Sequence, residues 1–190
     1  MKHTSLSIFL ILCSLITGCS AFDTFNKYAN ARFYTIYNSG GVGACDFKPK
    51  FNDCADREYF DVKISDDNNS LALAKYINQS SHVSYFGFTR DGFASQTKPI
   101  RDFLIWSKEN HAEDKKITMK RPAGNVAGYL FEKSEVEYTF QYIHTRAGVS
   151  MLVINSGGGD YYGFTYNEAV KLLNLIDSWY DSSFSEKKIY

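Results

Sequence analysis

Alternation of apolar and polar residues is the most regular pattern in this chain, and it is typical of strands that have one buried face. In residues 58–65, Phe60, Val62 and Ile64 fall on one face, which predicts that they point inward and that Lys63 points outward. Further strands are predicted at residues 31–37, 83–89, 103–107, 117–120, 136–144 and 149–154.

The last of these strands, residues 149–154, is apolar on both faces, which predicts a place inside a sheet with cover on each side. Thr165 and Glu168 then have the spacing of a capping box, which predicts the start of a helix. Apolar residues follow at helical spacing: Ala169, Leu172, Leu173, Ile176 and Trp179. The predicted fold is therefore α+β, an antiparallel β-meander of about six to eight strands with this C-terminal helix packed on one face.

Clusters of turn-forming residues predict where the strands end. A glycine cluster in residues 38–43 predicts the end of the first strand, and a polar loop containing Pro99 is predicted before residue 103. Residues 70–79 fit a strand or a short helix, and their alanine and leucine content favours the helix. The polar tail, residues 181–190, is expected to fray.

The N-terminus has the order of an export signal: the basic Lys2, an apolar run over residues 6–16, and small residues beyond it. This run is shorter than the roughly 20 residues that a membrane-spanning helix needs. It ends in Ile16-Thr17-Gly18-Cys19, which resembles the lipobox of bacterial lipoproteins. The resemblance covers the first twenty residues of the chain.

The lipobox resemblance implies that residues 1–18 are a signal peptide and that a diacylglycerol is attached to the sulfur of Cys19, whose new amine is acylated. Residues 19–30 are then a short tether, and residues 31–190 a single globular domain. An Asp after the lipidated Cys tends to retain a lipoprotein in the inner membrane, and this chain has Ser20 there. The resemblance thus implies lipid anchoring in the bacterial outer membrane.

An ordinary signal peptide cut after Ala21 is the alternative, and it predicts a soluble secreted protein. Cysteine parity favours the lipoprotein over ordinary cleavage at a point before Cys19. Ordinary cleavage before Cys19 would leave that residue with Cys45 and Cys54, an odd number for an oxidising compartment. Lipidation consumes the thiol of Cys19 and leaves Cys45 and Cys54 as a pair.

Cys45 and Cys54 enclose a polar stretch around Pro49 that has too little apolar content to hold itself together. In an oxidising compartment this pair predicts a structural disulfide. A zinc site is the alternative, but it needs three or four ligands. No His or third Cys of the mature chain lies nearby.

The chain has 21 Lys and Arg residues and 21 Asp and Glu residues, so its formal charges balance. The chain as a whole therefore has no net field to attract nucleic acid or an anionic membrane surface. Aromatic residues make up 16% of the chain, which indicates a β-rich core. This supply is larger than one face of a sheet needs, and surplus Tyr and Trp commonly form contact surfaces.

Catalytic motifs are scarce in the sequence. His82, His111 and His144 are each isolated from other His and Cys residues, and HExxH, GxSxG and CxxC are absent. The glycine-rich stretch after Ile154 precedes the predicted helix, but it lacks the Lys of a P-loop and fits a turn better. We predict no catalytic, cofactor-binding or metal-binding residue, although a Ser-His-Asp triad assembled only in the fold stays open.

These observations lead to an expected function. The sequence predicts a non-catalytic outer-membrane lipoprotein that binds a protein partner in the envelope, as an assembly factor, a pilot or an inhibitor does. The alternative is a small envelope hydrolase or glycan-binding protein. A contiguous patch of exposed aromatic residues favours the first reading. A deep pocket with a His beside a Ser or a carboxylate favours the second.

Overall fold

A computed structural model describes residues 34–76, 83–109, 113–122, 135–155 and 160–189. The predicted signal peptide, Cys19 and the tether lie outside the described residues, as do His82, His111 and the glycine-rich stretch 156–159. The fold below is that of the compact unit Thr35–Tyr190.

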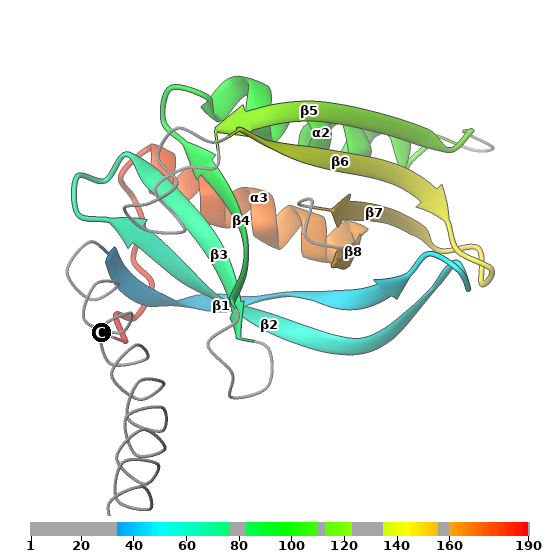
Figure 1. Ribbon diagram of the computed structural model, residues 1–190, viewed down its shortest axis with the longest axis horizontal. Coiled ribbons are helices and arrows are strands. Elements are labelled where there is room, and N and C mark those ends of the chain that lie inside the picture. Colours follow the sequence, from blue (N-terminus) through cyan, green and yellow to red (C-terminus); the bar gives the residue numbers. More distant parts are fainter. Residues whose placement is uncertain (1–33, 77–82, 110–112, 123–134, 156–159, 190) are drawn as a thin grey trace, which may run out of the picture. The chain divides into compact units, whose positions relative to one another are not determined.

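The described strands form one eight-stranded antiparallel sheet in the order β4-β3-β2-β1-β8-β7-β6-β5 (Figure 1). In chain order they are β1 (Tyr34–Lys48), β2 (Asp53–Ser65), β3 (Ser70–Tyr76), β4 (Val83–Thr89), β5 (Lys115–Pro122), β6 (Glu135–His144), β7 (Ser150–Asn155) and β8 (Tyr161–Thr165). Helix α2 (Phe93–Trp106) follows β4, and α3 (Tyr166–Tyr180) follows β8. The predicted α+β class with an antiparallel sheet is therefore confirmed.

Two runs of four consecutive strands make up the sheet, and each run ends in a helix. The runs join where the first strand, β1, lies beside the last strand, β8, with Cys45 opposite Gly163. A side chain at Gly163 would place its Cβ 2.6 Å from the sulfur atoms of both Cys45 and Met151, so glycine fits this junction.

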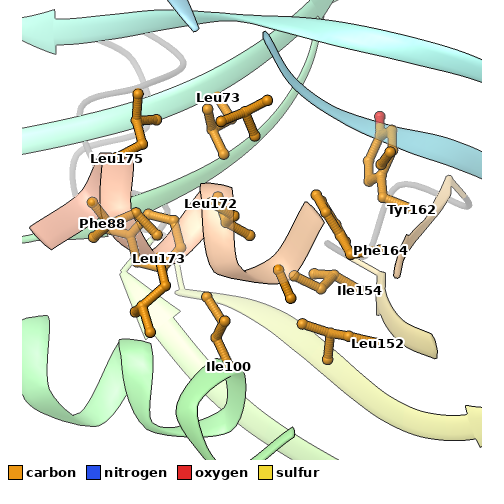
Figure 2. Packing of buried hydrophobic residues seen from close by; sticks show 14 of the residues in the cluster. Leu73, Phe88, Ile100, Leu152, Ile154, Tyr162, Phe164, Leu172, Leu173 and Leu175 are labelled. Atoms are coloured by element: carbon orange, nitrogen blue, oxygen red, sulfur yellow. The ribbon is translucent and has the colours of Figure 1, made fainter. Parts of the chain in front are cut away.

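The main buried cluster draws apolar side chains from both runs of strands and from both helices. Leu172 and Leu173 of α3 share this cluster with Ile154 of β7 and Phe164 of β8 (Figure 2). A second buried cluster contains Phe47, Ile143, Met151 and Val153. Strand β7 alternates between the two clusters, because Leu152 and Ile154 belong to the first. The prediction that this strand is covered on both faces is confirmed.

The strands predicted by alternation are mostly confirmed. Residues 58–65 lie in β2, 83–89 are β4, 117–120 lie in β5 and 136–144 lie in β6. One side-chain prediction in β2 is wrong, since Lys63 is only 2% exposed. Its partner in the strand register, Ala72 on β3, is also buried. Burial lowers the pKa of Lys63, and the carboxylate of Asp61 opposes that shift.

Three predictions of local structure are wrong, and in the first of them strand pairing overrides intrinsic propensity. Residues 70–76 form strand β3 rather than a helix, and this strand pairs with β2 and β4. Residues 103–106 are the end of α2 rather than a strand, and Pro99 lies inside that helix rather than in a loop. The buried side chains of α2 recur at helical spacing: Gln96, Thr97, Pro99, Ile100, Phe103 and Trp106.

The glycine cluster does not end the first strand. Strand β1 continues through it to Lys48, with Gly40 at φ 61° and Gly41 at φ 82°. Positive φ values favour glycine, so these residues change the backbone locally without ending the pairing. The tail also differs from its prediction: the backbone of Ile189 donates to Ile36 O at 2.7 Å, and that of Asn38 donates to Lys187 O at 2.9 Å. The tail therefore pairs with β1 instead of fraying.

Both ends of helix α3 are held by side chains. The backbone N–H of Thr165 donates to the carboxylate of Glu168 at 2.8 Å, which completes the predicted capping box. Arg57 of β2 forms a 2.6 Å ion pair with the same carboxylate. At the other end, the guanidinium of Arg90 donates to the carbonyls of Trp179 and Tyr180 at 3.0 and 2.8 Å. A cation there also complements the helix dipole.

Tyr142 connects the sheet to α2, because its buried hydroxyl donates to Pro99 O at 2.7 Å. Burial raises the pKa of Tyr142 above its usual value. The unfolded chain releases this proton near pH 10 and the folded chain retains it, so this residue's contribution to stability is lost as pH rises above about 10.

We expect Tyr142→Phe to lower the free energy of unfolding by about 1 kcal/mol at neutral pH, through the lost hydrogen bond. Above pH 10 the unsubstituted protein loses the stability that comes from protonated Tyr142, whereas the variant has no such loss. The difference in free energy of unfolding between the two proteins should therefore shrink. Urea unfolding at pH 7 and at pH 11 measures both effects. A difference that stays constant across this range would contradict the account.

Candidate functional site

A shallow hollow opens where the end of α2, the start of β7 and the start of α3 meet. Its volume is about 420 Å³, and it is lined by Ser107, Lys108, Val149, Ser150, Thr165, Tyr166 and Asn167. The ammonium of Lys108 lies 5.4 Å from the centre of the Tyr166 ring. The hollow therefore combines a cation, a helix start and several hydroxyl groups.

The histidine of this region, His144, ends strand β6. Its Nδ1 lies 3.4 Å from Oδ1 of Asp114, and its ring centre lies 4.8 Å from that of Trp106. The backbone N–H of His144 also donates to Asp114, at 3.2 Å. In the register of β6 and β7, His144 is opposite Ser150, which lines the hollow. Directly opposite residues share one face of a sheet, so the fold brings a Ser, a His and an Asp together.

This trio has the residue types of a hydrolytic triad, but its geometry is loose. The 3.4 Å separation of His144 and Asp114 exceeds the usual hydrogen-bond range of about 2.7–3.2 Å. The Asp114 side chain is 59% exposed, whereas the orienting carboxylate of a triad is buried. The trio therefore lacks the short hydrogen bond from a buried carboxylate that orients the histidine of a triad.

The predicted disulfide is confirmed. Cys45 and Cys54 are joined across the ends of β1 and β2, with 5.5 Å between their Cα atoms. The sulfur of Met151 lies 3.4 Å from that of Cys54. The disulfide thus lies against the second buried cluster. Among the described residues, no group of three or more His, Cys, Asp or Glu side chains is placed to hold a metal ion.

Beyond the disulfide, the chain turns at Pro49 to Asn52, and the turn exposes an aromatic side chain. Phe51 is 55% exposed, and the ammonium of Lys50 lies 5.9 Å from its ring centre. The amide of Asn52 donates to His144 O at 3.0 Å, and the backbone of Arg146 donates to Asn52 O. These bonds hold the β1–β2 turn beside the turn between β6 and β7.

Sequence reasoning did not find the grouping of Asp114, His144 and Ser150. These residues are far apart in the chain, and only the strand register brings them together. A signal existed for the pair His144 and Ser150, since two predicted strands joined by a short turn define a hairpin register. No pattern in the sequence indicates the exposure of Phe51.

Comparison with protein-family models, with curated proteins and with solved structures found no match. Among the helices of the described part of the chain, none has both the length and the apolar character needed to span a membrane.

Proposed function

We propose that this protein is an outer-membrane lipoprotein, anchored by lipid on Cys19, that binds a protein partner in the bacterial envelope and is not a catalyst. The observation that carries the proposal is the lipobox-like Ile16-Thr17-Gly18-Cys19 after an apolar run. The disulfide between Cys45 and Cys54 supports an oxidising compartment. It also leaves Cys19 as the unpaired cysteine of the mature chain.

The non-catalytic part of the proposal rests on the shape of the described surface. The hollow beside α3 is open, and the carboxylate near His144 is exposed. The exposed aromatic side chains Phe51, Tyr59 and Tyr180 lie at separate places and do not form the contiguous patch that would favour protein binding. The protein-binding part of the proposal therefore rests on the lipobox-like stretch and on the large aromatic content of the chain.

The proposal includes a structural role for the C-terminal helix. We take α3 to be packed across one face of the sheet, where it would close the main buried cluster. The burial of Leu172 and Ile176 and the bonds from Arg57 and Arg90 to the two ends of α3 support this placement.

A small hydrolase is the second candidate function. The grouping of Asp114 and His144 with Ser150, which lines the hollow, favours it. In some enzymes, catalytic hydrogen bonds shorten when the substrate binds. A hydrolase function for this chain requires such a shortening of the distance between His144 and Asp114.

The test compares the unsubstituted chain with Cys19→Ser in a Gram-negative host. We expect the unsubstituted protein in the outer-membrane fraction, with an acyl mass on Cys19, and the Cys19→Ser protein in the soluble periplasmic fraction. Ser20→Asp is the matched control. It keeps the lipid but should move the protein to the inner membrane, so it separates sorting from anchoring.

Cross-linking in intact cells, followed by mass spectrometry, then identifies the partner. We expect a protein that the unsubstituted chain captures and the mislocalised Cys19→Ser chain does not. Turnover of an ester or a glycan by the purified domain, abolished by both Ser150→Ala and His144→Ala, would reverse the order of the two functions. Identical fractionation of the unsubstituted and Cys19→Ser proteins would refute lipid anchoring.

A further inference from the structure

Residues 182–189 follow α3 and lie beside the start of β1 (Figure 1). We call this segment the arm. The backbone N–H of Ile189 in the arm donates to Ile36 O at 2.7 Å, and the N–H of Asn38 donates to Lys187 O at 2.9 Å. The two bonds run in opposite directions between the segments, as in an antiparallel pair. The arm is therefore a short extra strand on the edge of β1.

Few side chains hold the arm in this place. The ring of Phe184 meets that of Tyr37 edge-on, with 5.0 Å between the ring centres. Phe184 and Glu186 are half-buried, and the other residues of the arm are exposed. Segments with few buried contacts and solvent-exposed backbone bonds open at a lower free energy than the core of a domain. The arm can therefore leave β1 while the rest of the fold stays intact.

The edge of β1 keeps its shape when the arm leaves. Strand β1 lies between β2 and β8 in the sheet, and β8 pairs with it further along, at Cys45 and Asp46. Pairing with these two strands does not depend on the arm. The N–H of Asn38 and the carbonyl of Ile36 are then without the partners that the arm supplies. Such a preformed edge accepts another extended segment through its main chain.

The hinge between α3 and the arm has an unfavourable backbone conformation. Ser182, the first residue of the arm, has φ 65°, in the left-handed region that residues other than glycine rarely adopt. The carboxylate of Asp181 accepts the N–H of Ser183 at 2.9 Å, which supports the turn. An extended backbone at Ser182 would remove the strain and carry the arm away from its own β1.

From these observations we infer that the arm exchanges between two copies of this chain, so that the arm of each copy pairs with β1 of the other. A second copy is the occupant that fits this edge, because its arm reproduces the contacts that the chain's own arm makes. The exchange is reciprocal and closes a symmetric dimer. The arm contacts are the same in monomer and dimer, so relief of strain at the two hinges favours the dimer. This inference goes beyond the proposed function and does not depend on the lipid on Cys19.

The first test changes the hinge alone, in the Cys19→Ser chain without its signal peptide. Sedimentation equilibrium at increasing protein concentration should show monomer and dimer for the chain with Ser182. Proline fixes φ near −65°, so Ser182→Pro excludes the closed hinge and should lower the dissociation constant of the dimer about tenfold. Glycine adopts a positive φ without strain, so Ser182→Gly should raise this constant about tenfold.

The second test asks whether the arm crosses between copies. Lys188 of the arm is opposite Tyr37 of β1. Directly opposite residues of antiparallel strands have Cα atoms within the range that a disulfide spans. A Tyr37→Cys chain is therefore mixed with a Lys188→Cys chain, and the mixture is oxidised mildly. We expect a covalently linked dimer. The matched control mixes the Tyr37→Cys chain with a Lys171→Cys chain, whose new thiol is on an exposed position of α3.

Several results would overturn the inference. One is a chain that stays monomeric at every concentration both with Ser182 and with Ser182→Pro, and another is a Ser182→Gly chain that dimerises as readily as the Ser182→Pro chain. Linkage of Tyr37→Cys to Lys188→Cys no faster than in the control would show that any dimer uses another surface. Linkage of Tyr37→Cys to a different envelope protein in intact cells, without linkage to Lys188→Cys, would assign the edge of β1 to a partner's strand instead.

Discussion

Leu172→Asp is expected to prevent the domain from accumulating in folded form. The side chain of Leu172 is fully buried in the main cluster, together with side chains from β7, β8 and α2. An unpaired carboxylate in such a place costs several kcal/mol, whether it is buried charged or neutralised by a raised pKa. Domains of this kind have only about 5–15 kcal/mol of stability, so the loss removes most of it.

Two companion variants make this result interpretable. Asn174→Asp adds the same charge to an exposed position of α3 and should change stability by no more than about 0.5 kcal/mol. Leu172→Ala should cost about 2–5 kcal/mol and leave a folded protein that can be measured. Soluble yield and urea unfolding give the readouts. A Leu172→Asp protein as stable as the Asn174→Asp protein would show that this face of α3 does not contribute to the core.

Removal of the disulfide has the second largest expected effect. Cys45→Ala combined with Cys54→Ala frees the unfolded chain from a closed loop with a sequence separation of 9. Chain entropy for a loop of this size predicts a loss of about 2–3 kcal/mol. In thermal unfolding this corresponds to a fall in Tm of roughly 5–10 °C for a domain of this size.

The unsubstituted protein in a thiol reductant is the control for this variant. It loses the covalent link but keeps both sulfur atoms against Met151. Its stability should therefore be equal to or slightly above that of the double variant, and the gap measures the packing of the sulfurs alone. Equal unfolding midpoints in oxidised and reduced protein would contradict a stabilising role for the link.

The strands with one buried face could be predicted from the sequence because local alternation reports the burial of each face. Strand β6, with buried Tyr138, Phe140 and Tyr142, is the clearest example. Helix α3 could also be predicted, because its capping box and the helical spacing of its apolar residues both indicate a helix in this part of the chain. The pairing of the half-buried Cys45 and Cys54 could be predicted by counting the cysteines of the mature chain.

The remaining elements depended on contacts that a local pattern does not contain. Strand β3 consists of good helix formers, and only its pairing with β2 and β4 makes it a strand. Helix α2 was hidden by Pro99 and by the buried polar residues Gln96 and Thr97, which resemble a loop in the sequence. The side chain of Gln96 can be buried because its amide oxygen accepts a hydrogen bond from the backbone N–H of Thr89 at 2.7 Å.

The candidate site was the least predictable part. Asp114, just before β5, contacts His144, and Ser150 is opposite His144 in the register of β6 and β7. The short turn between the two predicted strands indicates the pairing of His144 with Ser150, but nothing in the separate segments indicates the contact with Asp114.

The junction of β1 with β8 affects how the chain folds after synthesis. Cys45 pairs opposite Gly163, and Ile36 accepts a hydrogen bond from Ile189, so the first strand of the sheet needs partners from the last part of the chain. Contacts of such long sequence separation slow folding. Until the last part of the chain is available, β1 keeps one unpaired edge, which is open to other chains. A polypeptide with this topology should therefore complete its sheet only when the whole chain is present, in milliseconds to seconds rather than microseconds.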